Sequence, residues 1–295
     1  MPDSIVMGDD KMKIAVLSGK GGAGKTLVAI NLAVTAEKGI YADCDVEEPN
    51  GHLFFKPKKC DSESVEVTIP VIDTEKCTAC RQCVDFCRFN ALAMIAGKVM
   101  LFEEICHSCG GCQLVCPEKA IHERKRSIGT VQSGHDGEIK VLTGILNTGE
   151  AAGVPIIKEI LKKIPAKGNV FIDCPPGSAC SVMESIQEAD FCLLVAEPTI
   201  FGRDNLAMIH ELVTLFDKPA GLLLNKVTDG ENPSQMYGLE HHLPIMGKIP
   251  YDRELSTVNA AGNIVSREIS KYEVFFRELL QRIEKEASHE TSTGA

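Results

Sequence analysis

"LSGKGGAGKT" occupies residues 17–26 and decides how the surrounding chain folds. Residues 19–26 fit the pattern G-x-x-x-x-G-K-[ST], in which glycines let backbone N–H groups turn inward around phosphate oxygens. A short apolar run precedes this loop, and residues 26–38 after it have the apolar spacing of a helix. The order strand, glycine-rich loop, helix predicts a phosphate site at the helix N-terminus. We expect Lys25 to contact the β- and γ-phosphates and the Thr26 hydroxyl to bind Mg²⁺.

The same alternation of strand and helix continues through the rest of the chain. Apolar runs that end in polar loops occupy residues 40–45, 169–177, 191–198 and 221–227, and helical patterns separate the last three. This order predicts an α/β fold, a doubly wound and mostly parallel sheet with helices on both faces. No run reaches the roughly 18 apolar residues that span a bilayer, so we expect no membrane insertion.

A second lysine, Lys20, directly follows the first glycine of the loop. The resulting K-G-G-x-G-K-T resembles the deviant phosphate loop of the MinD/ParA family of P-loop ATPases, which includes the nitrogenase iron protein and Mrp-type iron–sulfur carriers. The resemblance implies Mg²⁺-dependent ATP hydrolysis, with ATP and ADP as ligands. It also implies that Lys20 reaches across a nucleotide-dependent homodimer, or a heterodimer with a paralogue, to the partner's nucleotide.

Two acidic segments resemble the switches of that family. In "DCDVEEPN" (43–50), Asp45 would orient the attacking water and Asp43 would lie at the Mg²⁺ shell. In "FIDCPPG" (171–177), Asp173 would hold Mg²⁺ through water. The alternative for Asp43 and Asp45 is that they are acidic residues that merely end a strand.

Two weaker resemblances concern the base of the nucleotide. Asn225 in "LLLNKV" would contact the adenine edge, and Pro250 in "GKIPYD" would belong to a loop that closes over the base, although a purely structural role remains open for both. Lys20, Lys25 and Asp45 are the predicted catalytic residues. The predicted nucleotide-binding residues are Gly19, Lys20, Gly21, Gly22, Ala23, Gly24, Lys25, Thr26, Asp173, Asn225 and Pro250, with Thr26, Asp43 and Asp173 around Mg²⁺.

Eight cysteines interrupt the α/β pattern in two runs of C-x₂-C-x₂-C-x₃-C. Two such runs are the pattern of bacterial two-cluster ferredoxins, in which the fourth cysteine of each run binds the other cluster. We therefore predict a small α+β ferredoxin-like domain with two [4Fe–4S] clusters. Cluster I would use Cys77, Cys80, Cys83 and Cys116, and cluster II would use Cys106, Cys109, Cys112 and Cys87. Zinc is the alternative, but it prefers C-x₂-C pairs separated by a longer loop. Arg88 departs from the pattern, which usually has proline there.

These signals divide the chain into four parts. The prediction is a flexible N-terminal tail (1–11), a MinD/ParA-like ATPase domain (12–65 and 126–287), an inserted ferredoxin domain (66–125) and a C-terminal tail (288–295). Thirteen cysteines without a signal peptide indicate metal or redox use in the cytoplasm. The net charge of −10 argues against nucleic acid as a partner. One helical stripe near the C-terminus, flanked by at least as many acidic as basic residues, predicts packing on the sheet. The stripe consists of Tyr272, Phe275, Phe276, Leu279, Leu280 and Ile283.

Three functions are compatible with this combination. The first is an ATP-hydrolysing protein that couples nucleotide-dependent switching to electron transfer through two clusters, towards an unidentified redox partner. The second is an iron–sulfur or metallocofactor assembly factor, although no cysteine follows Cys192, so the bridging C-x-x-C that Mrp-like carriers have near the C-terminus is missing. The third is a non-redox positioning switch with a structural ferredoxin module.

Overall fold

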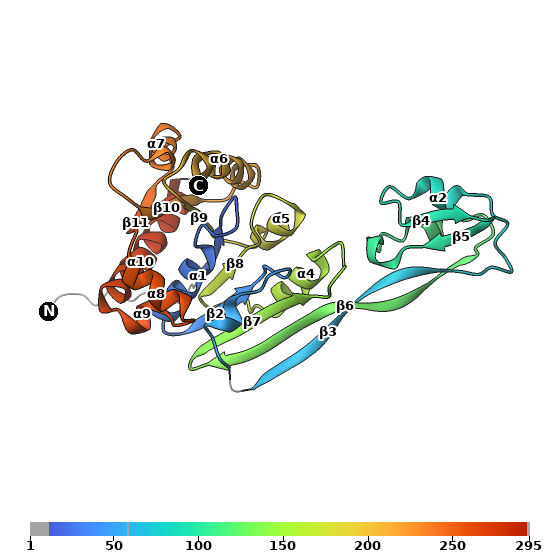
Figure 1. Cartoon of the computed structure of the whole chain (residues 1–295), viewed down its shortest axis with the longest axis horizontal. Helices are drawn as coiled ribbons and strands as arrows, with labels where there is room; N and C mark the ends of the chain where they lie inside the picture. The colour runs from blue at the N-terminus through green and yellow to red at the C-terminus, as the bar shows by residue number, and fades with distance from the viewer. Residues whose placement is uncertain (1–11, 58, 294–295) are drawn as a thin grey trace.

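The computed structural model describes residues 12–57 and 59–293, so the predicted N-terminal tail lies outside the described residues. Nine strands form one sheet (Figure 1), and its first seven strands run parallel. The strand order across the sheet is β11 (Ile245–Pro250), β10 (Ala220–Val227), β9 (Phe191–Ala196), β1 (Lys13–Leu17), β8 (Val170–Asp173), β2 (Gly39–Asp43), β7 (Ile139–Leu146), β6 (Ile121–Asp136) and β3 (Cys60–Ile72). The predicted mostly parallel sheet is confirmed.

Helices cover both faces of this sheet, and each face has its own apolar core. One face packs against α1 (Lys25–Thr35), α8 (Arg253–Ala260), α9 (Val265–Glu268) and α10 (Ser270–Thr293). The other face packs against α4 (Val154–Lys162), α5 (Cys180–Ile186), α6 (Ile200–Leu215) and α7 (Pro233–Glu240). Burial of near-continuous apolar strands between two helical layers is what a parallel sheet requires.

The last helix, α10, places its apolar stripe in the core as predicted. Tyr272, Phe276 and Ile283 are buried in the same cluster as the strands. The helix continues to Thr293, through most of the segment that we expected to be a tail. Within the described part of the chain, no helix is both long enough and apolar enough to cross a membrane.

The two antiparallel strands at the sheet edge form a long ribbon. β3 pairs with β6 along its whole length, from Cys60–Gly134 to Ile72–Ile121, whereas β6 pairs with β7 only from Gly129 onward. The ribbon therefore leaves the sheet and carries residues 73–120 away from it (Figure 1). The predicted boundaries of the insert, 66 and 125, lie within the ribbon.

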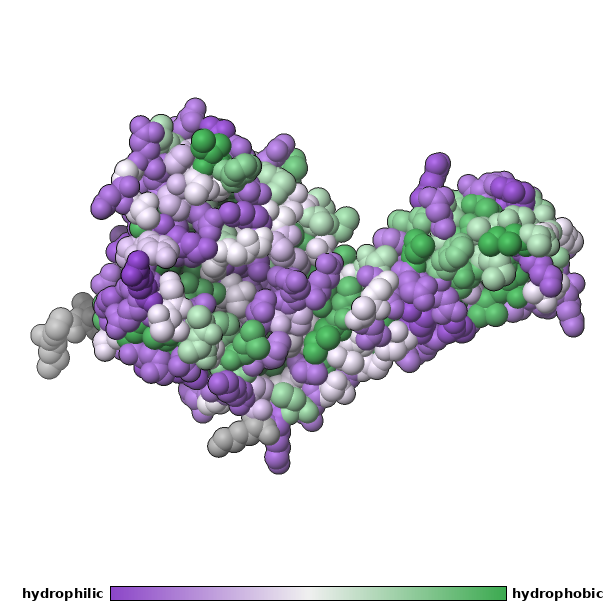
Figure 2. Space-filling view, in the orientation of Figure 1, coloured by the Kyte–Doolittle hydropathy of each residue, from purple (hydrophilic) through white to green (hydrophobic). Residues whose placement is uncertain are grey.

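A small module stands at the far end of the ribbon. It contains a separate two-stranded sheet and short helical segments: α2 (Gln82–Phe86), β4 (Leu92–Ile95), β5 (Lys98–Leu101), η2 (Glu103–Ile105) and α3 (Gly111–Leu114). Its small core consists of Cys83, Leu92, Val99 and Ile121. Apolar side chains are also visible on the surface of this module (Figure 2), and the exposed ones include Phe86, Phe89 and Leu114.

Candidate functional site

The phosphate loop lies where β1 ends and α1 begins, at the carboxyl edge of the parallel strands. Gly22 and Gly24 have positive φ angles of 80° and 101°. A Cβ atom on Gly24 would lie 2.1 Å from Nδ2 of Asn225, so only glycine fits there. The loop thus has the left-handed backbone that turns N–H groups towards an anion. Thr26 follows in the first turn of α1.

Asn225 supports this loop from the neighbouring strand β10. Its buried side chain donates a hydrogen bond from Nδ2 to the Ala23 carbonyl (2.8 Å) and accepts one at Oδ1 from the Lys226 backbone (2.9 Å). Both ends of the amide are therefore engaged within the protein. The adenine contact of Asn225 stays a prediction, as does that of Pro250, which lies exposed at the end of β11.

Lys25 lies between two carboxylates. Its side chain is 8% exposed, and its Nζ lies 3.3 Å from Asp45 Oδ2 and 3.4 Å from Asp173 Oδ1. Burial alone would lower the pKa of Lys25, but the attraction of Asp173 and Asp45 outweighs it and raises the pKa. The lysine is therefore held as a cation in a place where it can meet phosphate oxygens.

One carboxylate oxygen of Asp173 lies beside Lys25 without accepting a hydrogen bond in the described part of the chain. The buried Oδ2 of Asp173 accepts a hydrogen bond from the Tyr41 hydroxyl (2.9 Å), whereas Oδ1 accepts none from the described residues. A buried carboxylate oxygen beside the phosphate loop that has an ion pair with Lys25 but, among residues 12–57 and 59–293, no hydrogen bond fits a hydrated magnesium ion. Tyr41 was not predicted as a site residue, because its place in an apolar strand gives no sign of a polar partner.

Asp43 holds the backbone of the segment that we predict to be the first switch. It is fully buried, and it accepts hydrogen bonds from the backbone N–H groups of Gly51 (2.8 Å) and Asp45 (3.3 Å). Burial raises the pKa of Asp43, and the nearby Asp173 adds to this effect. In this structure Asp43 fixes the backbone that carries Asp45, and its place at the Mg²⁺ shell stays a prediction.

Lys20 forms an ion pair within its own chain. Its Nζ lies 2.5 Å from Oε2 of Glu197, and Lys226 binds the other oxygen of the same carboxylate at 2.6 Å. Lys226 also donates to the Gly22 carbonyl (2.8 Å). Partial burial would raise the pKa of Glu197, but the hydrogen bonds from Lys20 and Lys226 lower it below the ordinary value. Glu197 and Lys226 were not predicted as site residues. Both lie at the carboxyl ends of strands, β9 and β10, at the edge of the sheet that carries the loop.

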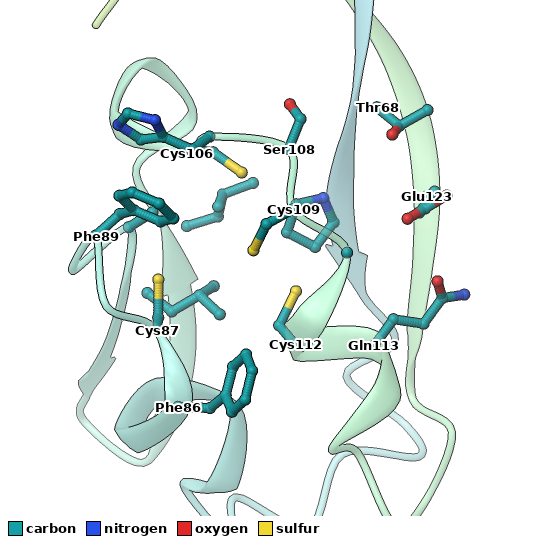
Figure 3. A pocket seen from close by; sticks show the side chains of 16 residues that line it. Thr68, Phe86, Cys87, Phe89, Cys106, Ser108, Cys109, Cys112, Gln113 and Glu123 are labelled. Carbon is teal, nitrogen blue, oxygen red and sulfur yellow. The ribbon is translucent and has the colours of Figure 1, made fainter. Parts of the chain in front are cut away.

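The eight cysteines of the module line two separate cavities. Cys87, Cys106, Cys109 and Cys112 surround the first, and Figure 3 shows their sulfur atoms around one shared space. The second cavity is lined by Cys77, Cys80, Cys83 and Cys116. Each cavity thus combines three cysteines of one run with the fourth cysteine of the other run. The structure brings together the two sets that the crossed pattern proposed, and their iron ligation stays a prediction.

The two cysteine runs adopt the same backbone conformation. Positive φ angles recur at equivalent positions: 56° at both Ala79 and Ser108, and 67° and 69° at Arg81 and Gly110. Successive backbone N–H groups in such conformations form concave anion sites, which many iron–sulfur centres use. The runs also exchange equivalent hydrogen bonds, from Asp73 N to Ala120 O (2.7 Å) and from Phe102 N to Ala91 O (2.8 Å). This pseudo-twofold arrangement explains why the fourth cysteines cross over.

Burial disfavours the charged form of several thiols in the module. Burial raises the pKa of the Cys112 thiol to about 11 and also raises the pKa values of Cys83 and Cys106. Thiolates there need a compensating cation. Among residues 12–57 and 59–293, no three His, Cys, Asp or Glu side chains converge closely enough to hold a single ion. Four cysteine sulfur atoms around each cavity are the type of donor set that a four-iron cluster uses.

Comparison with known proteins gives one family match that spans most of the chain. The model of the CobQ/CobB/MinD/ParA nucleotide-binding domain matches residues 14–265. An uncharacterised protein of Methanocaldococcus jannaschii is 29% identical over 282 residues, which cover 93% of this chain and 97% of that protein. The 35.5 kDa chain of chlorophyllide reductase from Rhodobacter capsulatus is 23% identical over 275 residues, 91% of this chain and 72% of that one.

A solved structure shares the fold. The septum site-determining protein MinD from Pyrococcus horikoshii, complexed with Mg-ADP, superposes with a TM-score of 0.57 at 18% sequence identity, and the match covers 93% of this chain and 96% of the other. At this identity the likeness shows the fold alone.

Proposed function

Because the chain belongs to the CobQ/CobB/MinD/ParA family of nucleotide-binding proteins, we propose that it is an ATPase that couples ATP-dependent dimerisation and switching to electron transfer through two [4Fe–4S] clusters. Cys77, Cys80, Cys83 and Cys116 would hold cluster I, and Cys87, Cys106, Cys109 and Cys112 would hold cluster II. When bound, the clusters supply sites for one-electron transfer. The recipient is a redox protein still to be identified.

The ATPase half of this proposal rests on the charges around the phosphate loop. Lys25 lies beside the loop and is kept cationic by Asp45 and Asp173. When ATP binds, Lys25 would give up these contacts and bind phosphate oxygens instead. Asp45, released from that pair, would orient water towards the γ-phosphate. Thr26 and Asp173 would hold Mg²⁺, with Asp43 fixing the switch behind them.

Dimerisation is proposed from the deviant lysine. Lys20 is 37% exposed at the rim of the loop, which leaves it able to rotate away from Glu197 towards a second copy. The charge of Lys20 would then meet the partner's nucleotide. Such exchange would make assembly depend on bound ATP.

One observation carries the redox half: the two cavities that each combine four cysteines from both runs. A structural zinc pair or a set of buried thiols would not require the crossed fourth cysteine or the matched left-handed positions. The similarity to a chlorophyllide reductase chain over 91% of this chain also supports a reductive role.

The decisive experiment measures iron and assigns it by variants. Anaerobically purified protein should contain about eight iron atoms per chain, as two four-iron clusters require. Cys116→Ser should damage the cluster that Cys77, Cys80 and Cys83 share, and leave the set nearest to it in sequence intact. Paramagnetic resonance of the reduced variant identifies the lost signal. Cys60→Ser, a change at an exposed cysteine outside both cavities, is the matched control.

Different results would favour other functions. Loss of the opposite cluster in Cys116→Ser would refute the crossed ligation. Transfer of iron to an acceptor apoprotein during ATP turnover, with the eight cysteines left empty, would favour an assembly factor. Full ATP-dependent activity with a folded but cluster-free module would favour a positioning switch.

A further inference from the structure

A loop of the ATPase domain touches the module directly beside the cysteines of the first cavity. Residues 147–153 connect β7 to α4, and the loop extends towards the module (Figure 1). The backbone N–H of Ala151 donates to the Glu104 carbonyl (3.2 Å) in η2. Cys106 follows η2 immediately in sequence. The ATPase domain therefore contacts the module at the residues that lead into the second cysteine run.

An ion pair reinforces this contact. The carboxylate of Glu150 binds Nη1 and Nη2 of Arg126 at 2.5 and 2.6 Å, and the two side chains are only 8% and 15% exposed. Nη2 of Arg126 also donates to the Glu103 carbonyl (3.0 Å), which accepts a second hydrogen bond from the backbone of Cys106 (3.2 Å). Bidentate arginine–carboxylate pairs fix geometry as well as charge. The pair thus holds the carbonyl to which the Cys106 backbone is bound.

The two ends of the same loop lie against Val46, in the segment predicted to be the first switch. Val46 follows Asp45 directly, and its carbonyl accepts a hydrogen bond from the Leu146 backbone (2.8 Å). A Cβ atom on Gly153 would lie 2.4 Å from Val46 Cγ2, and one on Gly144 would lie 2.6 Å from Cγ1. Val46 therefore packs directly on backbone at both ends of the connection. Close-packed contacts of this kind cannot absorb a shift of the switch without moving the loop.

The other cysteine set has no comparable connection. Within residues 12–57 and 59–293, no hydrogen bond or ion pair joins residues 74–86 or 113–120, which carry Cys77, Cys80, Cys83 and Cys116, to the ATPase domain. Lys76, which precedes Cys77 as Ile105 precedes Cys106, pairs with Asp73 inside the module. The two cavities therefore differ in their mechanical link to the nucleotide site.

We propose that Glu150 and Arg126 are positioning residues that transmit the position of the first switch to Cys106, so that bound nucleotide acts on the Cys87, Cys106, Cys109 and Cys112 set and not on the other set. The route runs from Asp45 through Val46, the 147–153 loop and the ion pair to the Cys106 backbone. This inference deepens the proposed function and rests on it wherever a cluster is mentioned.

The test compares Glu150→Gln with a matched control, Asp136→Asn. Asp136 forms a similar two-armed pair with Arg267 (3.3 and 3.4 Å) at the opposite end of β6. Anaerobic holoproteins are measured without nucleotide, with ADP and with a non-hydrolysable ATP analogue. Hydrogen–deuterium exchange of residues 103–106 and potentiometric titration of both clusters are the two readouts.

In the parent protein and in Asp136→Asn, the analogue should change exchange at 103–106. It should also change the equilibrium constant for reduction of cluster II by about five- to 150-fold, the usual range of such couplings, and leave cluster I unchanged. For one electron this factor corresponds to a midpoint shift of about 40–130 mV. Glu150→Gln should keep its iron and its ATP affinity and lose both responses. If that variant does not fold, Arg126→Lys, which keeps the charge but not the two-armed geometry, serves instead.

The inference is overturned if Glu150→Gln retains the full nucleotide response, or if the analogue shifts cluster I alone. Absence of any nucleotide response in a parent protein that carries about eight irons and hydrolyses ATP would also overturn the inference, and would leave the clusters and the ATPase of the proposed function standing. A parent protein without iron would refute the proposed redox function. Hydrogen–deuterium exchange at residues 103–106 would still decide whether the 147–153 loop transmits the effect of bound nucleotide to the module.

Discussion

Replacing Glu197 by glutamine should strengthen ATP-dependent dimerisation. In the described chain, Lys20 is bound to Glu197 at 2.5 Å. If Lys20 must reach the partner's nucleotide, this ion pair has to break in each protomer before the dimer forms. Glutamine keeps the size of the side chain and a hydrogen-bond acceptor, but it removes the charge that retains Lys20.

The exposure of the pair sets the size of the effect. Lys20 is 37% exposed and Glu197 is 13% exposed, so water screens the attraction from one side. Such pairs contribute about 0.2–1 kcal/mol each. A symmetric dimer breaks two of them, which is about 0.4–2 kcal/mol in total. Since about 1.4 kcal/mol corresponds to a tenfold change in affinity, the dimer constant should increase roughly two- to thirtyfold.

Light scattering and sedimentation with a non-hydrolysable ATP analogue measure this constant. The dimer constant of Glu197→Gln should exceed that of the parent by less and less as the salt concentration rises towards about 1 M, where the Debye length falls to about 3 Å. Lys226→Gln is the control, because it removes the second partner of Glu197 and leaves the Lys20 pair in place. Unchanged or weaker dimerisation of Glu197→Gln at low salt would show that Lys20 does not have to leave Glu197, and the basis for its role across the dimer would be lost.

Three substitutions and one labelling experiment test the site and the core. Lys25→Ala should abolish ATP binding, whereas Asp45→Ala should bind ATP and fail to hydrolyse it; wild-type phosphate release by Asp45→Ala would exclude its water-orienting role. Phe276→Ala, at a fully buried position in α10, should lower the free energy of unfolding by about 3–5 kcal/mol in denaturant titrations, and a loss below about 1 kcal/mol would contradict the packing of this helix. Burial raises the pKa of Cys192 to about 12, so between pH 7 and 9 its thiol stays protonated and should resist alkylation in the native protein while exposed Cys60 reacts; equal labelling by mass spectrometry would refute this.

Local spacing accounts for what could be predicted from the sequence. The phosphate loop needs glycines and Lys25 at fixed offsets between a strand and a helix, so a short window is sufficient to identify it. The parallel sheet follows from alternating apolar strands and amphipathic helices. The two cysteine runs have the same spacing and, in the structure, the same backbone conformation. The sequence pattern was therefore sufficient to predict which cysteines lie together around each cavity.

Contacts between distant segments could not be predicted in the same way. Tyr41 and Asp173 are 132 positions apart and meet only because β2 and β8 are neighbours in register. The pair of Arg126 and Glu150 depends on how far the ribbon carries the module and on how it turns there. Neither depends on a spacing within one segment, so sequence patterns contain no sign of them.

The ribbon has a consequence for how this protein can be rebuilt. Ile72 is paired with Ile121, and the next backbone groups, Asp73 N and Ala120 O, are hydrogen-bonded at 2.7 Å. The module therefore enters and leaves through two adjoining strand ends, which a two-residue turn such as Asn-Gly can also join. Replacing residues 73–120 by such a turn should therefore leave β3 and β6 as a plain hairpin at the edge of the sheet. The cysteine module is in this sense a replaceable insertion. A different domain whose termini lie close together should be insertable between the same two strand ends.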